Sequence, residues 1–328
     1  MKLSRAGELS LLTILRKRFG KRFRGVLVGI GDDAAVISSG KNILLTTDMM
    51  VEGVHFDLSW TTPFQLGFKL VSVNISDIFA MGGTPHYILL NFSARRTSTR
   101  EFFDRFFDGI EEALKTYGVS LIGGDISSSD RIMLSLTAVG AGGKVLKRKG
   151  ARVGDRIYVT GTLGDSACGL ALLRKMRRTI DLMKRKRTGL PVAWDVALPL
   201  LRRHLMPLAR NPERISGSAT AMIDISDGLL LDLSRLCTES GVGARIQLRH
   251  IPVSEEMKAT AACLGISAHD LALSGGEDYE LLFTAPAKVK VKAFCIGEIT
   301  RAGISVVDDN GKRIKVSARG YQHFSLQG

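Results

Sequence analysis

The sequence lacks the long apolar runs and the cysteine patterns that mark several classes of protein. No uninterrupted apolar stretch approaches the roughly 20 residues of a membrane-spanning helix, so we expect no integral membrane protein. The four cysteines show no CxxC spacing, which argues against a zinc site or a disulfide framework. The short stretch Leu9–Leu15 runs into Arg16–Lys17–Arg18 without a cleavage site, as in an amphipathic helix and not a signal peptide. We therefore expect a cytoplasmic protein.

Several catalytic motifs are also missing. No GxxxxGK[ST] or HExxH occurs, which excludes a P-loop kinase and a zincin. The stretch GIGDDA at Gly29–Ala34 fits the loose dinucleotide pattern GxGxxA, but such a turn should open a helix. The residues that follow, Ala34–Ile37, are typical of a strand instead. A Rossmann site is therefore rejected.

Positive charge is abundant but unevenly placed. Lys and Arg total 46 against 32 Asp and Glu, a net +14, which permits nucleic acid, a membrane surface or a phosphorylated metabolite as partner. Eight basic residues and one acid fall in Arg174–Arg187. The windows without any Lys or Arg are Gly25–Gly40, Leu70–Ala94, Tyr117–Asp130, Ile157–Leu173, Ala219–Ser234 and Ser267–Ala287. Because these windows hold most of the clustered carboxylates, bound divalent cations are the simplest means of neutralising them.

The length of 328 residues and the alternation of elements predict two mixed α/β domains. Strands are expected at Val26–Ile30, Ala34–Ile37, Ile43–Thr47, Tyr87–Ala94, Ser120–Ile122, Ile132–Gly140, Arg156–Thr160, Ala221–Ile225, Leu281–Ala285 and Phe294–Ile299. Helices are expected at Phe64–Asn74, Thr99–Tyr117, Asp165–Met176 and Asp227–Ser240. The segment Ala141–Gly154, rich in glycine and basic residues, is the expected connection between the domains.

Acidic residues recur where apolar segments are expected to end in turns. They are Asp32, Asp33, Asp48, Asp77, Asp125, Asp224 and Asp227, and hydroxyls at Thr46, Thr47, Ser76 and Ser226 stand beside them. Any one of them could be an ordinary turn or helix-capping residue. Together they favour a magnesium site, because ligand sites form where strands end and Mg²⁺ prefers oxygen donors.

Seven motifs occur in the order typical of one enzyme family. They are GIGDDAAVI, TTDMMVEGVHF, VNISDIFAMGGTP, LIGGDIS, VTGTLGDSACGL, IDISDGLLLDL and LSGGEDYELLFT. The sequence resembles the thiamine-monophosphate kinases, within the superfamily of aminoimidazole ribonucleotide synthetase-like enzymes, from about Gly29 to Phe324. The resemblance implies an α/β (α+β) fold with an N-terminal ATP- and magnesium-binding domain at 1–142 and a C-terminal domain at 150–328 that completes the substrate site. It also implies a homodimer in which N-terminal strands pair.

The same resemblance assigns roles to individual residues. It implies magnesium ligation by Asp33, Thr46, Thr47, Asp48, Asp77, Asp125, Asp224 and Asp227, with Asp32 in support, and it places Asp48, Asp77 and Asp125 at the catalytic centre. Contacts with ATP fall to Gly124, Asp125, Arg148 and Ser226. Contacts with thiamine monophosphate fall to His55, Glu277 and Tyr321. Simpler alternatives are a solvated Arg148, a helix-start Glu277 and a packing role for Tyr321.

The resemblance implies a kinase that uses ATP and Mg²⁺ to convert thiamine monophosphate into thiamine diphosphate. This agrees with the residues, because joining two phosphates requires positioning and charge neutralisation more than a protein nucleophile. One alternative keeps the ATP site but changes the acceptor, as in the synthetases of the superfamily. Another, a nucleic-acid-binding protein, rests on the net charge alone, and few aromatics interleave with Arg174–Arg187. We expect no nucleic-acid or membrane partner.

Overall fold

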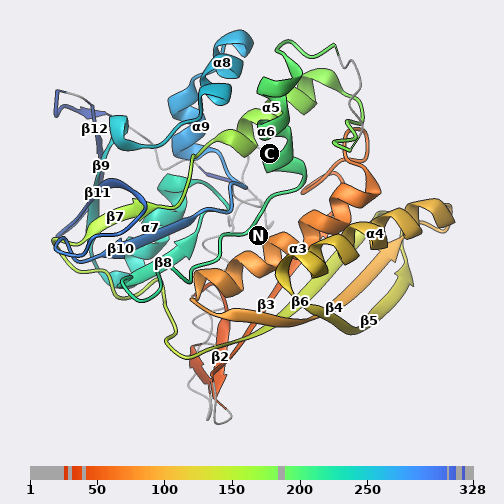
Figure 1. Cartoon of the computed structure of the whole chain (residues 1–328), viewed down its shortest axis with the longest axis horizontal. Coiled ribbons are helices and arrows are strands. Elements are labelled where there is room, and N and C mark those ends of the chain that lie inside the picture. Colours follow the sequence, from red (N-terminus) through yellow and green to blue (C-terminus); the bar gives the residue numbers. More distant parts are fainter. Residues whose placement is uncertain are drawn as a thin grey trace, which may run out of the picture.

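The computed structural model shows an α/β protein built on two separate sheets (Figure 1). It describes residues 26–28, 32–38, 42–183, 189–308, 310–314 and 320–321. The helix expected around Leu9–Leu15, the end of the strand expected at Val26–Ile30 and the last part of the basic run lie outside these residues. In the described part of the chain, no helix combines the length and the apolar character needed to cross a bilayer.

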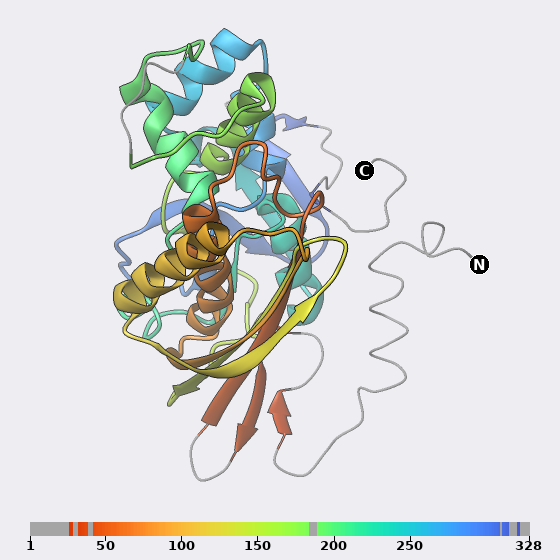
Figure 2. The ribbon, with the colours of Figure 1, turned by 90° about the vertical axis from the view of Figure 1, so that its right-hand side faces the viewer.

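The first sheet has six strands in the order β1-β2-β3-β6-β4-β5, and all neighbours are antiparallel except β4 and β5. The strands are β1 (Val26–Val28), β2 (Ala35–Ser38), β3 (Asn42–Val51), β4 (Thr84–Ala94), β5 (Ser120–Ser128) and β6 (Met133–Gly142). Two helices, α3 (Pro63–Ala80) and α4 (Arg100–Tyr117), cover one face, and the turned view in Figure 2 keeps both on the same side of the strands.

Helix α3 lies between the two sheets, packing against β3 and β6 of the first and β8 of the second. A capping box formed by Thr62 and Gln65 starts it, and Pro63 occupies its first turn. The helix ends at Ala80, six residues beyond the expected end at Asn74, because its residues are buried almost without interruption and continue to find packing partners. The expectation of a turn at Asp77 is therefore wrong.

Two other acids expected in turns also lie inside regular elements. Asp48 is in the long strand β3, and Asp125 is in β5, which is longer than its sequence pattern predicts. Close packing of α3 on α4 depends on glycine, since a Cβ at Gly67 would lie 2.1 Å from the carbonyl oxygen of Phe106. The missing side chain of Gly67 thus allows the backbones of α3 and α4 to pack closely.

The second sheet has seven strands in the order β13-β12-β9-β11-β7-β10-β8, and all neighbours are antiparallel except β12 and β9. The strands are β7 (Arg156–Val159), β8 (Ala221–Asp224), β9 (Gly243–Gln247), β10 (Leu281–Ala285), β11 (Phe294–Thr300), β12 (Ile304–Val307) and β13 (Arg313–Ile314). The helices are α5 (Asp165–Met176), α6 (Trp194–Leu205), α7 (Leu229–Ser240), α8 (Glu255–Leu264) and α9 (Ala268–Ser274). The mixed α/β fold class is confirmed; the domain limits 1–142 and 150–328 stay predictions.

The face of the first sheet that turns away from α3 and α4 is apolar and exposed. By strand register this face carries Met49, Tyr87, Leu89 and Met133, and each of these side chains is exposed. Large apolar side chains grouped on one exposed sheet face indicate a surface for association.

Candidate active site

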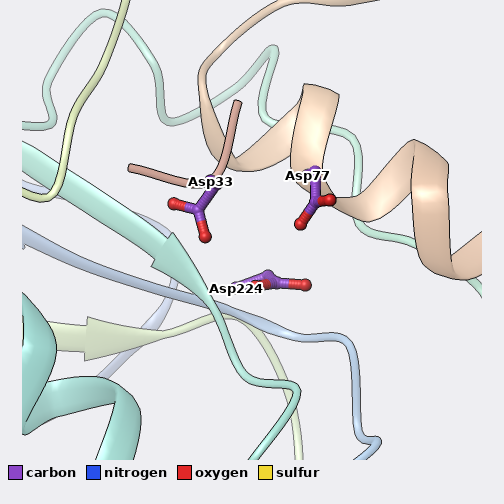
Figure 3. A group of neighbouring side chains, drawn as sticks. All are labelled: Asp33, Asp77 and Asp224. Atoms are coloured by element: carbon purple, nitrogen blue, oxygen red, sulfur yellow. The ribbon is translucent and has the colours of Figure 1, made fainter. Parts of the chain in front are cut away.

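Three carboxylates converge where the two sheets meet α3. Asp33 follows β1, Asp77 lies near the end of α3, and Asp224 is the last residue of β8. One carboxylate oxygen of each lies within 4.8 Å of the others, and Figure 3 shows the three side chains directed toward one common space. Segments separated by almost 200 residues therefore supply a single acidic cluster.

Neighbouring hydroxyls fix the orientation of two of these carboxylates. The Thr46 hydroxyl donates to Asp77 Oδ2 at 2.6 Å, and the Ser76 hydroxyl donates to Asp224 Oδ2 at 2.7 Å. Since each bond occupies only one oxygen of its acceptor, the other oxygen remains available to a ligand. The hydroxyls thus orient the acids without neutralising them.

The cluster holds more negative charge than its surroundings compensate. Burial raises the pKa of Asp77 and of Asp224 well above the ordinary value, and nearby carboxylates raise both further, Asp48 first for Asp77 and Asp33 first for Asp224. Burial, followed by the charges of Asp227 and Asp33, also raises the pKa of Asp48. Among the described residues, no Lys or Arg forms an ion pair with Asp77 or Asp224.

The donor set fits magnesium. All candidate ligands are oxygens, and crowded carboxylates with raised pKa values favour a divalent cation that restores their ionised form. Asp33, Asp77 and Asp224 would provide the central ligands of such an ion, and Asp48 is close enough to interact electrostatically with Asp77. The residues present are therefore suited to hold Mg²⁺.

Two more predicted residues lie beside this cluster, each in contact with a positive or polar partner. The backbone N–H of Asp48 donates to the side-chain oxygen of Asn74 at 3.1 Å, which ties β3 to α3. Asp227 pairs with Arg235 of α7 at 2.6 Å, and Arg235 also contacts the buried Asp232 at 2.8 Å. Only its place in the VNISD motif could have identified Asn74 as a residue of this region.

Arg148 reaches the cluster from the segment between the sheets. Its guanidinium donates to both carboxylate oxygens of Asp33, at 2.7 and 3.3 Å, and its backbone N–H donates to Asp32. Burial and then the charge of Asp33 raise the pKa of Asp32 to about 6. The alternative of a solvated Arg148 is wrong, because this side chain is only 20 % exposed and is held by an ion pair.

Thr47, Gly124 and Asp125 are not brought to the cluster. Thr47 lies next to Thr46 in a strand, so it points to the opposite face, where its hydroxyl donates to the carbonyl of Leu136. Asp125 pairs in register with Asn91, which places it on the same outer face, and three strand spacings of about 4.8 Å separate β5 from β3. Gly124 packs against β4, where a Cβ would lie 1.8 Å from the Leu90 oxygen.

Residues predicted to contact the acceptor border the cluster from two sides. The Glu277 N–H donates to the carbonyl of Ser226 at 2.7 Å, and the Tyr321 N–H donates to that of Asp227 at 3.2 Å. His55 is half-buried and accepts from the Val51 N–H at its Nδ1 atom, at 3.0 Å. The structure therefore places Ser226, Glu277 and Tyr321 around one strand end.

The stretches of sequence that contain no Lys or Arg are less isolated from positive charge in the folded protein than the sequence suggests. Cations reach the acids of these windows from elsewhere in the chain, as in the pairs Arg148–Asp33, Arg235–Asp227, Lys69–Glu277 and Arg203–Glu280. The inference that bound cations alone would balance these acids is therefore too broad. It holds for Asp77 and Asp224, whose side chains, among the residues that the structure describes, are hydrogen-bonded by hydroxyls and form no ion pair with a lysine or arginine.

Sequence reasoning missed several residues of this region. Lys69, Arg203, His204 and Arg210 all lie against the segment that follows Gly276, and Tyr279 is a buried member of that segment. One feature of the sequence could have identified Lys69. It is the single charged residue between Gln65 and Ser76, in a stretch of helix that is otherwise apolar or uncharged. For Arg203 and Arg210 no local pattern distinguishes them from solvated surface residues.

Comparison with known proteins agrees with these features. Profiles of the AIR synthase related protein family match residues 31–141 (N-terminal domain) and 152–313 (C-terminal domain). A thiamine-monophosphate kinase from Aquifex aeolicus is 36 % identical over 329 residues, covering 99 % of this chain and 100 % of the relative. This chain belongs to the thiamine-monophosphate kinase family. The kinase of that name from Escherichia coli K12 is 34 % identical and covers 97 % of this chain and 98 % of its own.

Solved structures show the same relationship. A structure described as AaThiL complexed with AMPPCP and TMP has a TM-score of 0.86 at 35 % identity, covering 98 % of this chain and 99 % of the other. The thiamine monophosphate kinase from Stenotrophomonas maltophilia has a TM-score of 0.73 at 32 % identity, covering 93 % and 96 %. A HypE–HypF complex matches at only 20 % identity with a TM-score of 0.69, and so shows the shared fold alone.

Proposed function

We propose that this chain transfers the γ-phosphate of ATP to thiamine monophosphate in a Mg²⁺-dependent reaction, giving thiamine diphosphate and ADP. The observation that carries the proposal is the cluster of Asp33, Asp77 and Asp224, an all-oxygen site in a member of this kinase family whose negative charge is met in part by Arg148 at Asp33. ATP and thiamine monophosphate both carry phosphates, which such a cluster repels unless a cation lies between them. When bound, Mg²⁺ neutralises phosphate charge and orients the transferred group.

The residues of the chain supply positioning rather than a nucleophile. Thr46 and Ser76 hold Asp77 and Asp224 at fixed orientations, and Asn74 holds the backbone at Asp48. Arg148 carries positive charge to the rim of the cluster, where it can approach a phosphate of ATP. Because the acceptor phosphate is already ionised near neutral pH, no strong general base is required, and the proposed transfer is direct and in line.

The test is ATP consumption with thiamine monophosphate, thiamine and aminoimidazole precursors side by side. We expect turnover with thiamine monophosphate only, full loss of activity in excess chelator, and recovery with millimolar Mg²⁺. A chiral γ-phosphate should be transferred with inversion, because one displacement inverts and two retain. Turnover with another acceptor only would reject the proposal, and retention would reject the direct step.

We also infer a cytoplasmic homodimer. The support is the exposed apolar face that carries Met49, Tyr87, Leu89 and Met133, together with four cysteines that are free thiols. Asp125 lies on that same face, so a metal-binding role for it requires a second copy packed there. Light scattering should give twice the mass of the chain, and Met49→Asp should shift the protein to monomer; a wild-type monomer at micromolar concentration would overturn the inference.

A further inference from the structure

Residues 277–280 form a segment in which each side chain is held by a different part of the molecule. Glu277 and Tyr279 have left-handed backbones, with φ of 67° and 50°, although neither is glycine. Such conformations are strained for residues other than glycine and persist only where the surroundings impose them. Here the N–H groups of both residues bond to carbonyls at the end of β8, those of Ser226 and Ile225.

The side chains extend in alternate directions from this backbone. Asp278 accepts from the N–H groups of Gly164 and Ser166 at the start of α5. Tyr279 is buried in the core of the first sheet and α3. Glu280 is fully buried and pairs with Arg203 and Arg210. The segment is thus anchored in both halves of the molecule, and Glu277 is the member that remains near the open site, with 29 % of its side chain exposed.

Lys69 is the partner that fixes Glu277. It lies in the middle of α3 with only 4 % of its side chain exposed, and its Nζ atom is 2.6 Å from Glu277 Oε1. Lysine is rarely buried so completely unless an acid pairs with it. The pair therefore joins the central helix of the first half to the site-lining segment of the second.

Other groups face Glu277 from α6, from the turn after β3 and from its own segment. His204 Nδ1 lies 3.3 Å from Glu277 Oε2, His55 acts on Glu277 electrostatically, and Tyr279 lies two residues away. Burial, followed by the charges of Lys69 and Arg174, lowers the pKa of His204 to about 3, so His204 is neutral. In the described part of the chain, the permanently charged residue that forms an ion pair with Glu277 is therefore Lys69.

The positive charge of Lys69 determines the protonation state of Glu277. Burial alone would raise the pKa of Glu277, but the pKa is lowered, and the charge of Lys69 is the largest of the influences that lower it. Lys69 also lies eight residues before Asp77 on the same helix, an axial separation of about 12 Å at 1.5 Å per residue. A phosphorylated acceptor with its phosphate at the acidic cluster can therefore extend its ring toward Glu277.

We propose that Lys69 is a positioning residue for acceptor recognition: it holds the part-exposed Glu277 carboxylate through Oε1, with Oε2 beside His204, so that the carboxylate faces the cationic ring of the acceptor. The proposal rests on the proposed function for the identity of that acceptor. Lys69 touches neither ATP nor the transferred phosphate in this assignment; it acts through Glu277. Without Lys69, Glu277 would be half-buried beside the neutral His204, with no paired lysine to favour its ionised form.

The decisive variant is Lys69→Met, which keeps the length of the side chain and removes its charge. We expect the KM for thiamine monophosphate to rise about tenfold at pH 7.5, with the KM for ATP changed less than about twofold. As the pH rises from 7 to 9 the KM of the variant should fall again, because Glu277 then ionises without help, while the wild-type KM stays flat. A merely structural role would produce no such recovery.

A second readout uses a neutral acceptor in which carbon replaces the positively charged ring nitrogen. Wild type should prefer the cationic acceptor, and Lys69→Met should lose that preference at pH 7.5. Lys144→Met is the matched control, since Lys144 also ties two segments, through the carbonyls of Ser216, Gly217 and Ala219, but lies outside the site. It should lower stability and leave both KM values unchanged.

If Lys69→Met does not fold, the double variant Lys69→Met with Glu277→Gln removes both buried charges and should fold. It should turn over slowly and ignore the charge of the acceptor ring. Unchanged acceptor KM in Lys69→Met, an equal rise in the KM for ATP, or charge preference that survives in the double variant would each overturn the proposal. Absence of wild-type turnover with thiamine monophosphate would instead reject the proposed function, which keeps the two failures distinct.

Discussion

Two groups of carboxylates lie in this site, and they differ in how their charge is balanced. Asp77 and Asp224 accept hydrogen bonds from hydroxyls and have strongly raised pKa values, because burial and like charges oppose their ionisation. Glu280 is fully buried and Glu277 is half-buried, yet cations hold their pKa values below the ordinary range. Carboxylates of the same chemistry thus lack a paired cation at Asp77 and Asp224 and are paired with a lysine or arginine at Glu277 and Glu280 among the described residues.

The difference shows that burial of an acid does not by itself identify a site. What distinguishes the cluster, in the part of the chain that the structure describes, is that Asp77 and Asp224 form no ion pair with a lysine or arginine, whereas Glu277 and Glu280 do. Glu280 has its charge met by Arg203, Arg210 and the Thr160 hydroxyl, so no free lone pair is directed at a ligand. We expect substitutions in the two groups of carboxylates to change the stability of the protein in opposite directions.

The largest expected effect is on turnover. Asp77→Asn should lower kcat by roughly a thousandfold, because the cluster loses a charged ligand where phosphate charge must be neutralised. In metal-free buffer the same variant should be more stable than wild type by roughly 1 kcal/mol, since one of several crowded like charges is gone. Steady-state kinetics and chemical unfolding in EDTA measure the two effects.

The control for this prediction is Asp104→Asn, which removes an exposed carboxylate from an i,i+4 pair with Arg100. Both kcat and stability should stay within experimental error. Loss of stability in metal-free Asp77→Asn would show that the acid is structural after all.

The second expected effect is a loss of stability, where Asp77→Asn gains stability in metal-free buffer. Glu280→Gln should destabilise the protein by about 3 kcal/mol with or without Mg²⁺, because Arg203, with only 15 % of its side chain exposed, is left without its partner. Thermal unfolding measures it, with Glu298→Gln as the control, since Glu298 pairs with Arg156 and Arg245 at the surface. Equal melting temperatures for the two variants would contradict a structural role for Glu280.

A third effect concerns pH. The folded protein binds more protons than the unfolded chain wherever folded-state carboxyl pKa values are raised, so stability falls as pH rises above the ordinary aspartate value. Asp48, Asp77 and Asp224 contribute in this way, and Asp278, whose burial raises its pKa to about 7, does so as well. In EDTA we expect wild type to lose roughly 1–2 kcal/mol between pH 5 and pH 8.

Mg²⁺ should flatten this pH dependence, because it binds the ionised cluster. Urea unfolding at the two pH values, with EDTA and with Mg²⁺, is the measurement. Metal-free protein that is most stable at pH 8 would contradict raised carboxyl pKa values in the folded state.

The smallest expected effect is at Tyr321. Its side chain is 48 % exposed and its N–H bonds to Asp227, so an aromatic face can cover the acceptor ring at the edge of the site. Tyr321→Ala should raise the KM for thiamine monophosphate by about three- to tenfold and leave the KM for ATP unchanged. Phe294→Ala is the control, because Phe294 is an aromatic residue of the same exposure that lies in β11 of the second sheet. A rise in the KM for ATP alone would place Tyr321 on the nucleotide side.

Local patterns were sufficient for most regular elements. The spacing of Phe102, Phe106 and Ile110 predicts α4, and the structure confirms the helix with Thr99 as its cap and Gly118 as its stop. The end of α3 was not predictable, because its final turns contain Ser76 and Asp77, which are typical of turns. Burial between two sheets keeps that segment helical, and burial of this kind is not encoded in any short window of sequence.

For the site, the sequence by itself determined the supply of oxygen ligands and the motif order that places the chain in its family. It could not decide which acids meet. Asp33, Asp77 and Asp224 converge because α3 lies between the two sheets, whereas Thr47 and Asp125 point away because a strand turns alternate residues to opposite faces. Nor could it decide which acids keep a free charge, since Lys69 and Arg203 reach Glu277 and Glu280 across more than 70 residues of chain. Electrostatic balance depends on distance in space, and only the tertiary structure sets that distance.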